Sequence, residues 1–578
     1  MRTTIPFLLA ASFACSKPEV IDSGDSAVAT PACEALGLPA RSWHEGPYEA
    51  VLRGVAGDFT VPTTAGDWSF SQNFSGCETY LFVPSVPRSA ADWSVAIWEQ
   101  DIKELFDKLP RNAHLFFVSS SADKKGRDAD LALIEKKVQN RLTKLPDEEA
   151  EWRRARVHYV TKSVDKLDGW VGDYLRNPGH GFGIDRFQRI RDIGSLADGE
   201  RYDQAMGWFA PNLAHVAHEA ILYDFEATRQ QRLDADGADV VRVWTQRPIA
   251  DPHWAGVKEL VEVELPPKAD LARYDTLELD MTQTCEGAGE VGYCPAWDRL
   301  THLYVCDVPA PLPSPDPHAD QACEAGDTVP CDCENPDGTA DVGARACNDE
   351  GTGFGECSCD CDAEIGRWVT TYHREGRWLS DASFALPWLA QGGTVRLGYH
   401  SIDPWEVTLD LRFSTQDRPR PVATRFLFGG GAFGPAYNDK YAPIEIEIPA
   451  SAKKVELAYI ITGHGMEMPE NCAEFCDTNH RFGVNGEEHL VHFPEIGDQE
   501  HCQNDVVNGT IPNQYGTWFY GRSNWCPGKQ VDPVYIDITD QVELGAVNTF
   551  TYSGDYDGAP YHSNGASIAL SSWLVIRE

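Results

Sequence analysis

Short segments in which apolar and polar residues alternate fill the second half of the chain. Beyond about Ala238 they include LVEVELP, EVTLDLRFST, PIEIEIPA and VELAYIIT, separated by Pro, Gly and Asp. This alternation is typical of half-buried β-strands, and helical periodicity is almost absent. Many short strands favour antiparallel sandwiches, either jelly rolls or immunoglobulin-like. The stretch is too long for one sandwich, so we predict two, at residues 238–415 and 416–578.

Residues 33–237 have a different texture, in which strand-like and helix-like segments follow one another. CETYLFVP and AHLFFVSSS predict buried strands, and DADLALIEKKVQNRLTKLPDEEAEWRRARV predicts helix. GFGIDRFQRIRDIGSL resembles the late strand-turn-strand of thioredoxin-like domains, although this region has no C-x-x-C motif. We therefore expect an α/β, thioredoxin-like domain in which Cys33 and Cys77 form a structural disulfide rather than a redox site.

The N-terminus has the features of an export signal. MRTTIPFLLAASFACSKP contains Arg2, a short apolar core and small residues that lead to Cys15. It predicts a lipoprotein signal at residues 1–15 with lipid on Cys15, and a plain secretory signal is the alternative. Residues 16–32 have the composition of a flexible tether. We expect an exported protein, either a lipoprotein at the bacterial cell surface or outer membrane or a secreted protein.

The net charge and the cysteine content indicate which compartment the protein occupies and which partners are excluded. The formal net charge of −40 argues against nucleic acid or an anionic membrane as a partner, because no basic stripe offsets the acidic residues. No later segment has the ~20 continuous apolar residues of a membrane helix, so a lipid on Cys15 would be the one membrane contact. The chain has 17 cysteines, several in tight pairs, which indicates an oxidising compartment.

A segment rich in Pro, Asp, Gly and Cys interrupts the first predicted sandwich at residues 307–362. It has too little apolar mass to fold by burial, so we expect a disulfide-rich loop insertion. Zinc is the competing interpretation, but the thiols have no histidine ligands among them. We assign the insertion no catalytic role.

Three further cysteine pairs stand close to polar and aromatic residues. Cys285 and Cys294 precede Trp-Asp-Arg, Cys472 and Cys476 bracket Ala-Glu-Phe, and Cys502 and Cys526 enclose GTWFYGRSNW. A disulfide that closes a very short loop adds little global stability and mainly fixes local geometry. Rigid loops that carry carboxylates, Arg and Trp suit a carbohydrate-processing site.

Five motifs together resemble the peptide-N-glycosidase F family over residues 240–578. They are CPAWDRLTHLYV, IGRWVTTY, TGHG, CAEFC and RSNWCPG, in that order. The resemblance implies a mainly β fold of two eight-stranded antiparallel jelly-roll sandwiches side by side, with the site in the cleft between them. It also implies hydrolysis of the amide between N-acetylglucosamine and asparagine, which leaves aspartate in the peptide and releases the glycan as a glycosylamine. N-glycosylated peptides or glycoproteins are then the partners, no metal or organic cofactor is implied, and we expect a monomer.

The motifs carry the family's site residues onto this chain. Asp298 matches the essential aspartate, expected to activate the attacking water, and Arg299 beside it is expected to keep that carboxylate ionised and to contact the first sugar. Glu474 matches the glutamate of the small disulfide loop and is expected to be a second catalytic residue, positioned to bind water or the glycosylamine nitrogen. Arg522 and Trp525 match residues that orient peptide or glycan. Trp297 is expected to point into the core, because neighbouring side chains on a strand face opposite ways.

The chain also departs from the family pattern. The family's second glutamate has no clean counterpart, and RLGYHSIDPWEV offers either His400 or Asp403. In GHGM, His464 and Met466 stand where the family has Trp and His, and we keep His464 as a substrate-binding candidate. These changes affect sugar contacts more than the expected base, so glycan specificity and tolerance of core fucose stay undefined.

Two other functions compete with hydrolysis. A non-catalytic surface lipoprotein that binds glycans or glycoproteins would explain the changed sugar contacts. A copper-dependent monooxygenase of the same double-sandwich fold needs His clusters plus a Met, and the chain has no neighbouring His-x-His or His-His pair beside His464 and Met466. His215 and His218, three apart on a predicted helix, are expected at the surface rather than on a metal.

Overall fold

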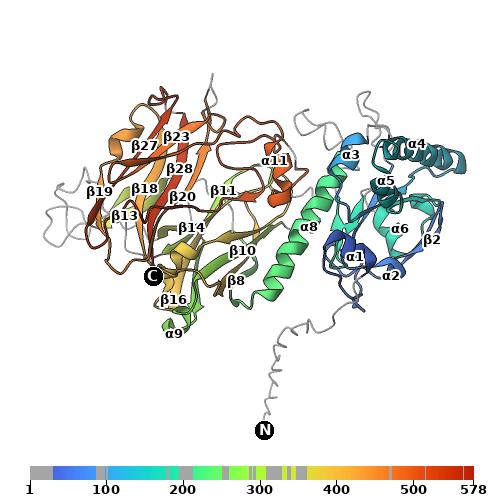
Figure 1. Ribbon diagram of the computed structural model, residues 1–578, viewed down its shortest axis with the longest axis horizontal. Helices are drawn as coiled ribbons and strands as arrows, with labels where there is room; N and C mark the ends of the chain where they lie inside the picture. The colour runs from blue at the N-terminus through green and yellow to red at the C-terminus, as the bar shows by residue number, and fades with distance from the viewer. Residues whose placement is uncertain are drawn as a thin grey trace, which may run out of the picture.

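A computed structural model shows two lobes joined by one long helix (Figure 1). One lobe is an α/β domain and the other holds two β-sandwiches. The described residues are 30–85, 98, 102–176, 181–193, 213–249, 259–285, 290, 294–306, 328–334, 340–346, 361–467, 472–514, 516–563 and 565–578. The expected signal at residues 1–15, with Cys15, and most of the tether and of the Cys-rich insertion lie outside them.

The N-terminal lobe is built on one mixed sheet in the order β2-β1-β5-β4-β3-β6-β7. Its centre is parallel, with β3 beside β4 and β4 beside β5, and the antiparallel hairpin β6–β7 follows on one side. All residues of β3 and β4 are buried, as expected for parallel strands that are covered on both faces. The strands are β1 (Thr60–Thr63), β2 (Gly66–Ser69), β3 (Thr79–Pro84), β4 (Ala113–Val118), β5 (Val157–Val160), β6 (Phe182–Ile184) and β7 (Ile190–Asp192).

Helices pack around this sheet. The longest of those that precede α8 is α4, which lies in the segment predicted to be helical. Its N-cap is Asp123, whose carboxylate accepts a hydrogen bond from the backbone N–H of Gly126 (2.9 Å). Cys33 and Cys77 form the predicted disulfide. The helices are α1 (Pro31–Leu36), α2 (Phe70–Asn73), α3 (Lys103–Lys108), α4 (Lys124–Leu142), α5 (Asp147–Arg154), the 3₁₀ turn η2 (Val164–Lys166), α6 (Gly169–Arg176) and α8 (Ala214–Ala235).

The first sandwich has eight strands of its own in two antiparallel sheets, ordered β15-β10-β17-β8 and β14-β11-β16-β9. The predicted alternation is clear in β10, where every second residue is buried. Its strands are β8 (Asp239–Pro248), β9 (Glu259–Leu265), β10 (Thr276–Thr284), β11 (Leu300–Cys306), β14 (Cys361–Val369), β15 (Gly376–Asp381), β16 (Gly393–His400) and β17 (Glu406–Ser414). Short helices α9 (Lys268–Leu271), η4 (Ser383–Ala385) and α10 (Leu386–Leu389) connect them.

The Cys-rich insertion leaves the first sandwich between β11 and β14. A disulfide between Cys306 and Cys361 closes its base. Within it β12 (Thr328–Glu334) and β13 (Ala340–Ala346) form an antiparallel hairpin.

The second sandwich also has eight strands, in sheets ordered β18-β28-β20-β26 and β19-β27-β23-β24. These are β18 (Pro421–Phe433), β19 (Ile444–Glu447), β20 (Lys454–His464), β23 (Thr478–Val484), β24 (Glu487–Val491), β26 (Val534–Asp537), β27 (Val547–Tyr556) and β28 (Ala566–Arg577). Smaller elements lie in its loops: η5 (Tyr437–Lys440), β21 (Met466–Glu467), β22 (Cys472–Ala473), α11 (His501–Asn504), η6 (Asp505–Asn508) and β25 (Lys529–Gln530). The mainly β fold with two eight-stranded sandwiches and an α/β region is therefore as predicted.

The two sandwiches share a buried junction. The short strand β25 extends the β14 edge of the first sandwich, although in the chain it lies between β24 and β26 of the second sandwich. Trp573 and Ile460 of the second sandwich pack into the same apolar cluster as Trp368 and Trp378 of the first. This continuous core fixes the loops at the sandwich ends relative to one another.

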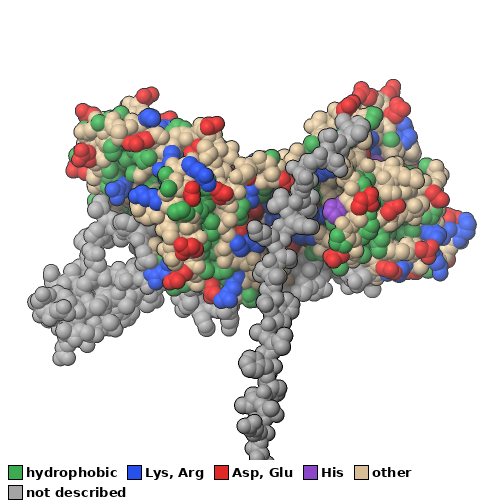
Figure 2. Space-filling model, turned by 90° about the horizontal axis from the view of Figure 1, so that it is seen from below, with side chains coloured by type: hydrophobic (Ala, Val, Ile, Leu, Met, Phe, Trp, Pro, Cys, Tyr) green, Lys and Arg blue, Asp and Glu red, His purple; other side chains and the backbone are tan. Residues whose placement is uncertain are grey.

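Helix α8 lies between the α/β lobe and the sandwiches (Figure 1). One apolar cluster joins its Val216 and Tyr223 and the lobe's Leu105 to Trp518 and Ile511 from the long loop before β25. Figure 2 shows the hollow between the two lobes, with Asp and Glu side chains scattered over both, in keeping with the net charge of −40. The lobe is thus packed onto the loops of the sandwiches rather than tethered beside them.

Candidate functional site

Asp298 lies on a short loop that enters β11. The disulfide Cys285–Cys294 ties the start of this loop to the end of β10. Thr370, just after β14, then holds both neighbours of Asp298: its hydroxyl donates to the Trp297 carbonyl (2.7 Å) and accepts from the Arg299 N–H (2.8 Å). The backbone on both sides of Asp298 is therefore fixed before β11 begins.

Glu474 comes from the second sandwich, inside the five-residue loop that the Cys472–Cys476 disulfide closes. Its N–H donates to the Gly465 carbonyl (3.3 Å), and its carbonyl accepts from the Ser523 N–H (2.9 Å). The loop is thereby attached to the strand end that carries His464 and to the segment that carries Arg522.

Arg522 brings the two carboxylates together. Its Nη2 lies 3.4 Å from Asp298 Oδ2, and its Nε lies 3.1 Å from Glu474 Oε1. Nη1 donates to the carbonyls of Thr517 (3.2 Å) and Tyr520 (3.0 Å). The guanidinium is almost fully buried, whereas the two carboxylate side chains keep 16% and 17% of their exposure, so solvent and substrate can reach them.

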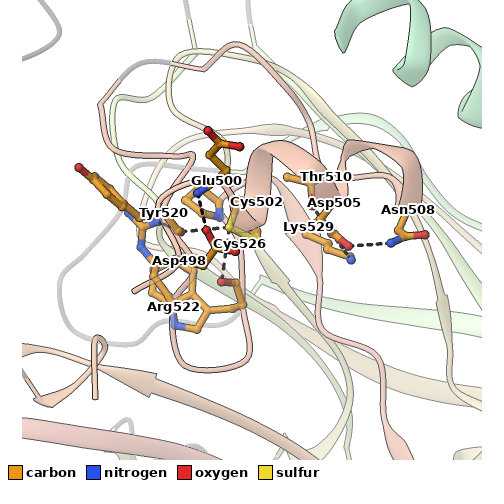
Figure 3. The surroundings of a disulfide bond; sticks show 12 residues. Asp498, Glu500, Cys502, Asp505, Asn508, Thr510, Tyr520, Arg522, Cys526 and Lys529 are labelled. Carbon is orange, nitrogen blue, oxygen red and sulfur yellow. Dashed lines mark hydrogen bonds and ion pairs between the residues drawn. A yellow bond between two sulfur atoms is a disulfide. The ribbon is translucent and has the colours of Figure 1, made fainter. Parts of the chain in front are cut away.

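The Cys502–Cys526 disulfide holds the loop on which Arg522 sits (Figure 3). Earlier in the same loop, Asp505 accepts hydrogen bonds from Asn508 (2.9 Å) and Thr510 (2.6 Å) and contacts Lys529. The Arg522 guanidinium is also packed between rings, 4.8 Å from the centre of Trp525 and 5.5 Å from that of Phe475. Covalent, polar and aromatic contacts together fix this arginine in one orientation.

Burial raises the pKa of both carboxyl groups. For Asp298 the raise persists although Arg522, a hydrogen bond from Tyr372 and Arg299 oppose it. For Glu474 the negative charge of Asp298 adds to the effect of burial, while Arg522 opposes it. Two carboxylates that share one guanidinium in a partly buried site are less stabilised as anions than a carboxylate with its own partner.

Tyr372 completes the site, and no role had been assigned to it from the sequence, although it lies in the motif IGRWVTTY. Its hydroxyl donates to Asp298 and lies 3.4 Å from Arg522 Nη2. Burial and the negative charge of Asp298 raise the pKa of this hydroxyl, so it stays a neutral hydrogen-bond donor. Tyr372 is identified as a site residue only because it lies next to Asp298 in the folded structure.

The structure corrects two expectations about the neighbours of Asp298. Trp297 is 54% exposed rather than buried in the core, because β11 begins only at Leu300 and strand alternation does not yet apply. Arg522, whose Nη2 lies 3.4 Å from the carboxylate, acts on the pKa of Asp298 more strongly than the neighbouring Arg299 does. Both arginines lower this pKa, as expected of Arg299, but burial outweighs them and the net shift is upward.

Trp525 and His464 lie side by side, and Trp525 also packs against the guanidinium of Arg522. Their ring centres are 5.2 Å apart, the Trp525 indole N–H donates to the Gly463 carbonyl (2.8 Å), and His464 Nε2 lies 2.8 Å from the Thr462 hydroxyl. Trp525 is buried and supports Arg522.

The two candidates for the missing glutamate have different surroundings. His400 lies at the end of β16, opposite the fully buried His302 of β11. Asp403 lies in the next loop, where burial raises its pKa and the positive charge of Arg299 opposes the shift. Asp403 therefore shares an electrostatic environment with Arg299, the neighbour of Asp298.

His218 is buried on α8 rather than at the surface, which corrects the sequence expectation; its Nε2 lies 3.2 Å from Gln503 Nε2. The side chain of His215 lies outside the described residues. Across the described part of the chain, no group of three or more His, Cys, Asp or Glu side chains is placed to hold a metal ion. Nor does any described helix have the length and apolar character needed to cross a membrane.

Comparisons with known proteins give a family match for the second sandwich. Residues 434–575 match the family model described as peptide-N-glycosidase F, C terminal. Among solved structures, the chain is similar to PNGase F, a glycosylasparaginase from Flavobacterium meningosepticum, at 16% identity over 59% of this chain and 96% of that one, with a TM-score of 0.39. It is also similar to PNGF-II at 15% identity over 61% of this chain and 68% of that one, again with a TM-score of 0.39. Curated protein sequences gave no significant match.

Proposed function

At residues 434–575 the chain belongs to the C-terminal domain of the peptide-N-glycosidase F family, and from this premise we propose that it is a peptide-N-glycosidase. It would hydrolyse the amide that joins N-acetylglucosamine to asparagine in N-glycosylated peptides or glycoproteins. The observation that carries the proposal is the meeting of Asp298 and Glu474, one from each sandwich, on the single guanidinium of Arg522.

In this proposal Asp298 is the general base. It takes a proton from a water molecule whose oxygen forms a bond to the asparagine side-chain carbon, and the carbonyl oxygen gains negative charge. Arg522 is the nearby donor that can stabilise this charge, and the neutral hydroxyl of Tyr372 donates its one proton to Asp298. When the C–N bond breaks, the leaving nitrogen takes a proton, and the products are aspartate in the peptide and a glycosylamine.

Glu474 is proposed to supply the proton to the leaving nitrogen. Burial and the negative charge of Asp298 raise its pKa, and both carboxyl groups contact Arg522, so in this proposal Glu474 carries a proton while Asp298 is ionised. One group is then available as a base and the other as an acid, which the reaction requires in its two steps.

The test is a defined N-glycopeptide incubated with the purified protein, with the peptide product weighed by mass spectrometry. Conversion of the glycosylated Asn to Asp, lost in Asp298→Asn, supports the amidase. A peptide that keeps one N-acetylglucosamine would mean cleavage between sugars and would overturn the assignment of the bond.

A glycan-binding protein without turnover is the second candidate, and His464 and Met466 at the family's sugar-contacting positions favour it. Asp298→Asn separates the two functions, because a binding protein keeps its affinity whereas a hydrolase loses turnover. Binding to several N-glycopeptides without cleavage of any would favour this candidate.

We also propose that the protein is exported and held at the cell surface by a lipid on Cys15, since the N-terminal sequence fits such a signal. Exchange of Cys15 for Ser should move the protein from the membrane fraction to the soluble fraction. Unchanged membrane association would contradict the anchor.

A further inference from the structure

Helix α8 of the N-terminal lobe contacts the loops that build the site, near η6 and α11 (Figure 1). The ring of Phe225 lies where a side chain at Gly509 would be, 2.5 Å from the ideal Cβ position. His218 contacts Gln503 in α11. The lobe therefore packs directly on the segment between Cys502 and Cys526 that carries Arg522.

Glu219, at the centre of this contact, is fully buried. Its two carboxylate oxygens accept from Arg374: Nη1 at 2.7 Å and Nη2 at 3.2 Å. Asn513 Nδ2 also donates to it, at 2.7 Å. One carboxylate from the N-terminal lobe thus binds one residue from the loop after β14 and one from the loop before β25.

Both bound residues lie next to the site. Arg374 follows Tyr372 by two positions, and Asn513 precedes Gln514. Gln514 accepts from the Tyr372 N–H (2.8 Å) and donates to the carbonyls of Ile511 (2.6 Å) and Pro527 (2.7 Å). The hydroxyl of Tyr372 then reaches Asp298 and Arg522.

We propose that Glu219 is a positioning residue for the proposed reaction, because through Arg374 and Asn513 it fixes the backbone that aims Tyr372 at Asp298. The expected effect of Glu219 on kcat rests on the proposed function. Its effect on the position of the two loops rests on the contacts alone. It makes the α/β lobe a part of the active site rather than a spacer.

The energetics of a buried pair support this role. Burial raises the pKa of Glu219, and its contacts with Arg374 and Asn513 oppose that shift, so the carboxylate depends on these two partners. Loss of one charge from a buried pair leaves the other uncompensated, and the loops must move to hydrate it. A displacement of a few tenths of an ångström in Tyr372 would then reduce kcat by about tenfold, since catalysis is sensitive to small errors in orientation.

The experiment compares Glu219→Gln with Glu78→Gln. Glu78 is a matched control, because it is also a buried glutamate of this lobe and its arginine partner, Arg156 (2.6 Å), lies in the same lobe. Glu219→Gln is expected to lower kcat about tenfold with KM unchanged, and Glu78→Gln to lower stability without changing kcat. An equal fall of kcat in both variants, or none in Glu219→Gln, would overturn the proposal.

Hydrogen exchange separates this inference from the proposed function. Glu219→Gln should increase exchange at the amides of residues 370–375 and 510–514, which are read out whether or not the protein cleaves glycopeptides. If the wild-type protein cleaves no glycopeptide, the proposed amidase activity is wrong. If hydrogen exchange in these two segments is unchanged, the proposed positioning role of Glu219 is wrong. If Glu219→Gln does not fold, Glu219→Leu with Arg374→Met removes both charges together and leaves neither one buried alone. The contact from Glu219 to Asn513 is lost as well, so kcat should still fall and exchange in residues 510–514 should still rise.

Discussion

Two clusters of arginine and carboxylate lie where the sandwiches meet, and their surroundings are opposite. In the buried junction, Glu364 accepts from Arg367 Nε and Nη2 (2.8 Å each), from Ser571 and from His302, and all of these side chains are buried. At the site, Asp298 and Glu474 share the single guanidinium of Arg522.

The pKa values follow from this difference in partners. Burial acts to raise the pKa of Glu364, but Arg367 and His302 outweigh it and lower the value to about 2. Burial raises the pKa of Asp298 and of Glu474, and the shared Arg522 does not outweigh it. A buried carboxylate whose hydrogen bonds are all satisfied stabilises the folded state. A carboxylate whose charged form is less well stabilised can exchange protons with a substrate.

The largest expected effect is the loss of Arg367. Its Nη1 also donates to Thr462 (3.0 Å) and to the Ala569 carbonyl (2.8 Å), so it joins the first sandwich to the second. Arg367→Met should lower the free energy of unfolding by about 3–5 kcal/mol, as is usual when one partner of a buried pair is removed. Urea unfolding of Arg367→Met and Arg522→Met measures the free energy of unfolding of each variant. An equal loss of stability in Arg522→Met would contradict the comparison.

The small disulfide loop is expected to matter less for stability than for geometry. Removing Cys472–Cys476, which closes five residues, should cost about 2 kcal/mol by chain entropy, against about 4 kcal/mol for Cys33–Cys77 with its sequence separation of 44. Thermal unfolding of the paired Cys→Ser variants gives the two costs. We expect turnover to fall in the first pair and to persist in the second, and the reverse order of activities would contradict the account.

Neutralising the carboxylates should change stability in opposite directions. The pKa of Asp298 is raised in the folded state, so its contribution to stability is present below the unfolded pKa and is lost as pH rises through the folded one. The pKa of Glu364 is lowered, so its contribution is present at neutral pH and is lost as pH falls toward about 2.

At pH 7, Asp298→Asn should therefore leave the thermal midpoint unchanged or higher, and Glu364→Gln should lower it. Scanning calorimetry of both variants against the wild type measures this contrast. A midpoint that falls by the same amount in both would mean that the site carboxylate is as fully stabilised as the buried one.

The smallest expected effect is on the pH profile. Because the general base must be ionised and its pKa is raised, the acidic limb of kcat/KM should lie above the usual value of 3.8 for an aspartate. Initial rates on one glycopeptide across acidic buffers give this limb. A limb at or below the ordinary value would show that Arg522 stabilises Asp298 as strongly as Arg367 stabilises Glu364.

The sequence predicted the parts of this arrangement that depend on local pattern. Strand alternation indicated the sandwiches, and cysteine spacing indicated the rigid loops around Asp298, Glu474 and Arg522. Tyr372 and Glu219 could not be predicted in this way, because they act through contacts between residues far apart in the chain.

The wrong expectations have different causes. Trp297 was placed in the core by strand alternation, but the chain there is a disulfide-tied loop and β11 starts later, at Leu300. His218 was placed at the surface because a pair of histidines three apart on a helix is usually exposed, but α8 is covered on one side by the lobe and on another by the loops of the sandwiches. The first error comes from the position at which the strand begins, and the second comes from tertiary contacts that cover the helix.

The most direct test of the central claim is the turnover of one N-glycopeptide in water enriched in ¹⁸O, with the wild type, Asp298→Asn and Glu364→Gln compared below their unfolding temperatures. We predict that the wild type and Glu364→Gln place ¹⁸O in the side-chain carboxyl of the new aspartate at similar rates. Asp298→Asn should be slower by at least about 10²-fold, the usual contribution of a general base. Wild-type turnover by Asp298→Asn, with loss of turnover in a folded Glu364→Gln, would contradict the assignment of chemistry to the shared arginine and of structure to the buried one.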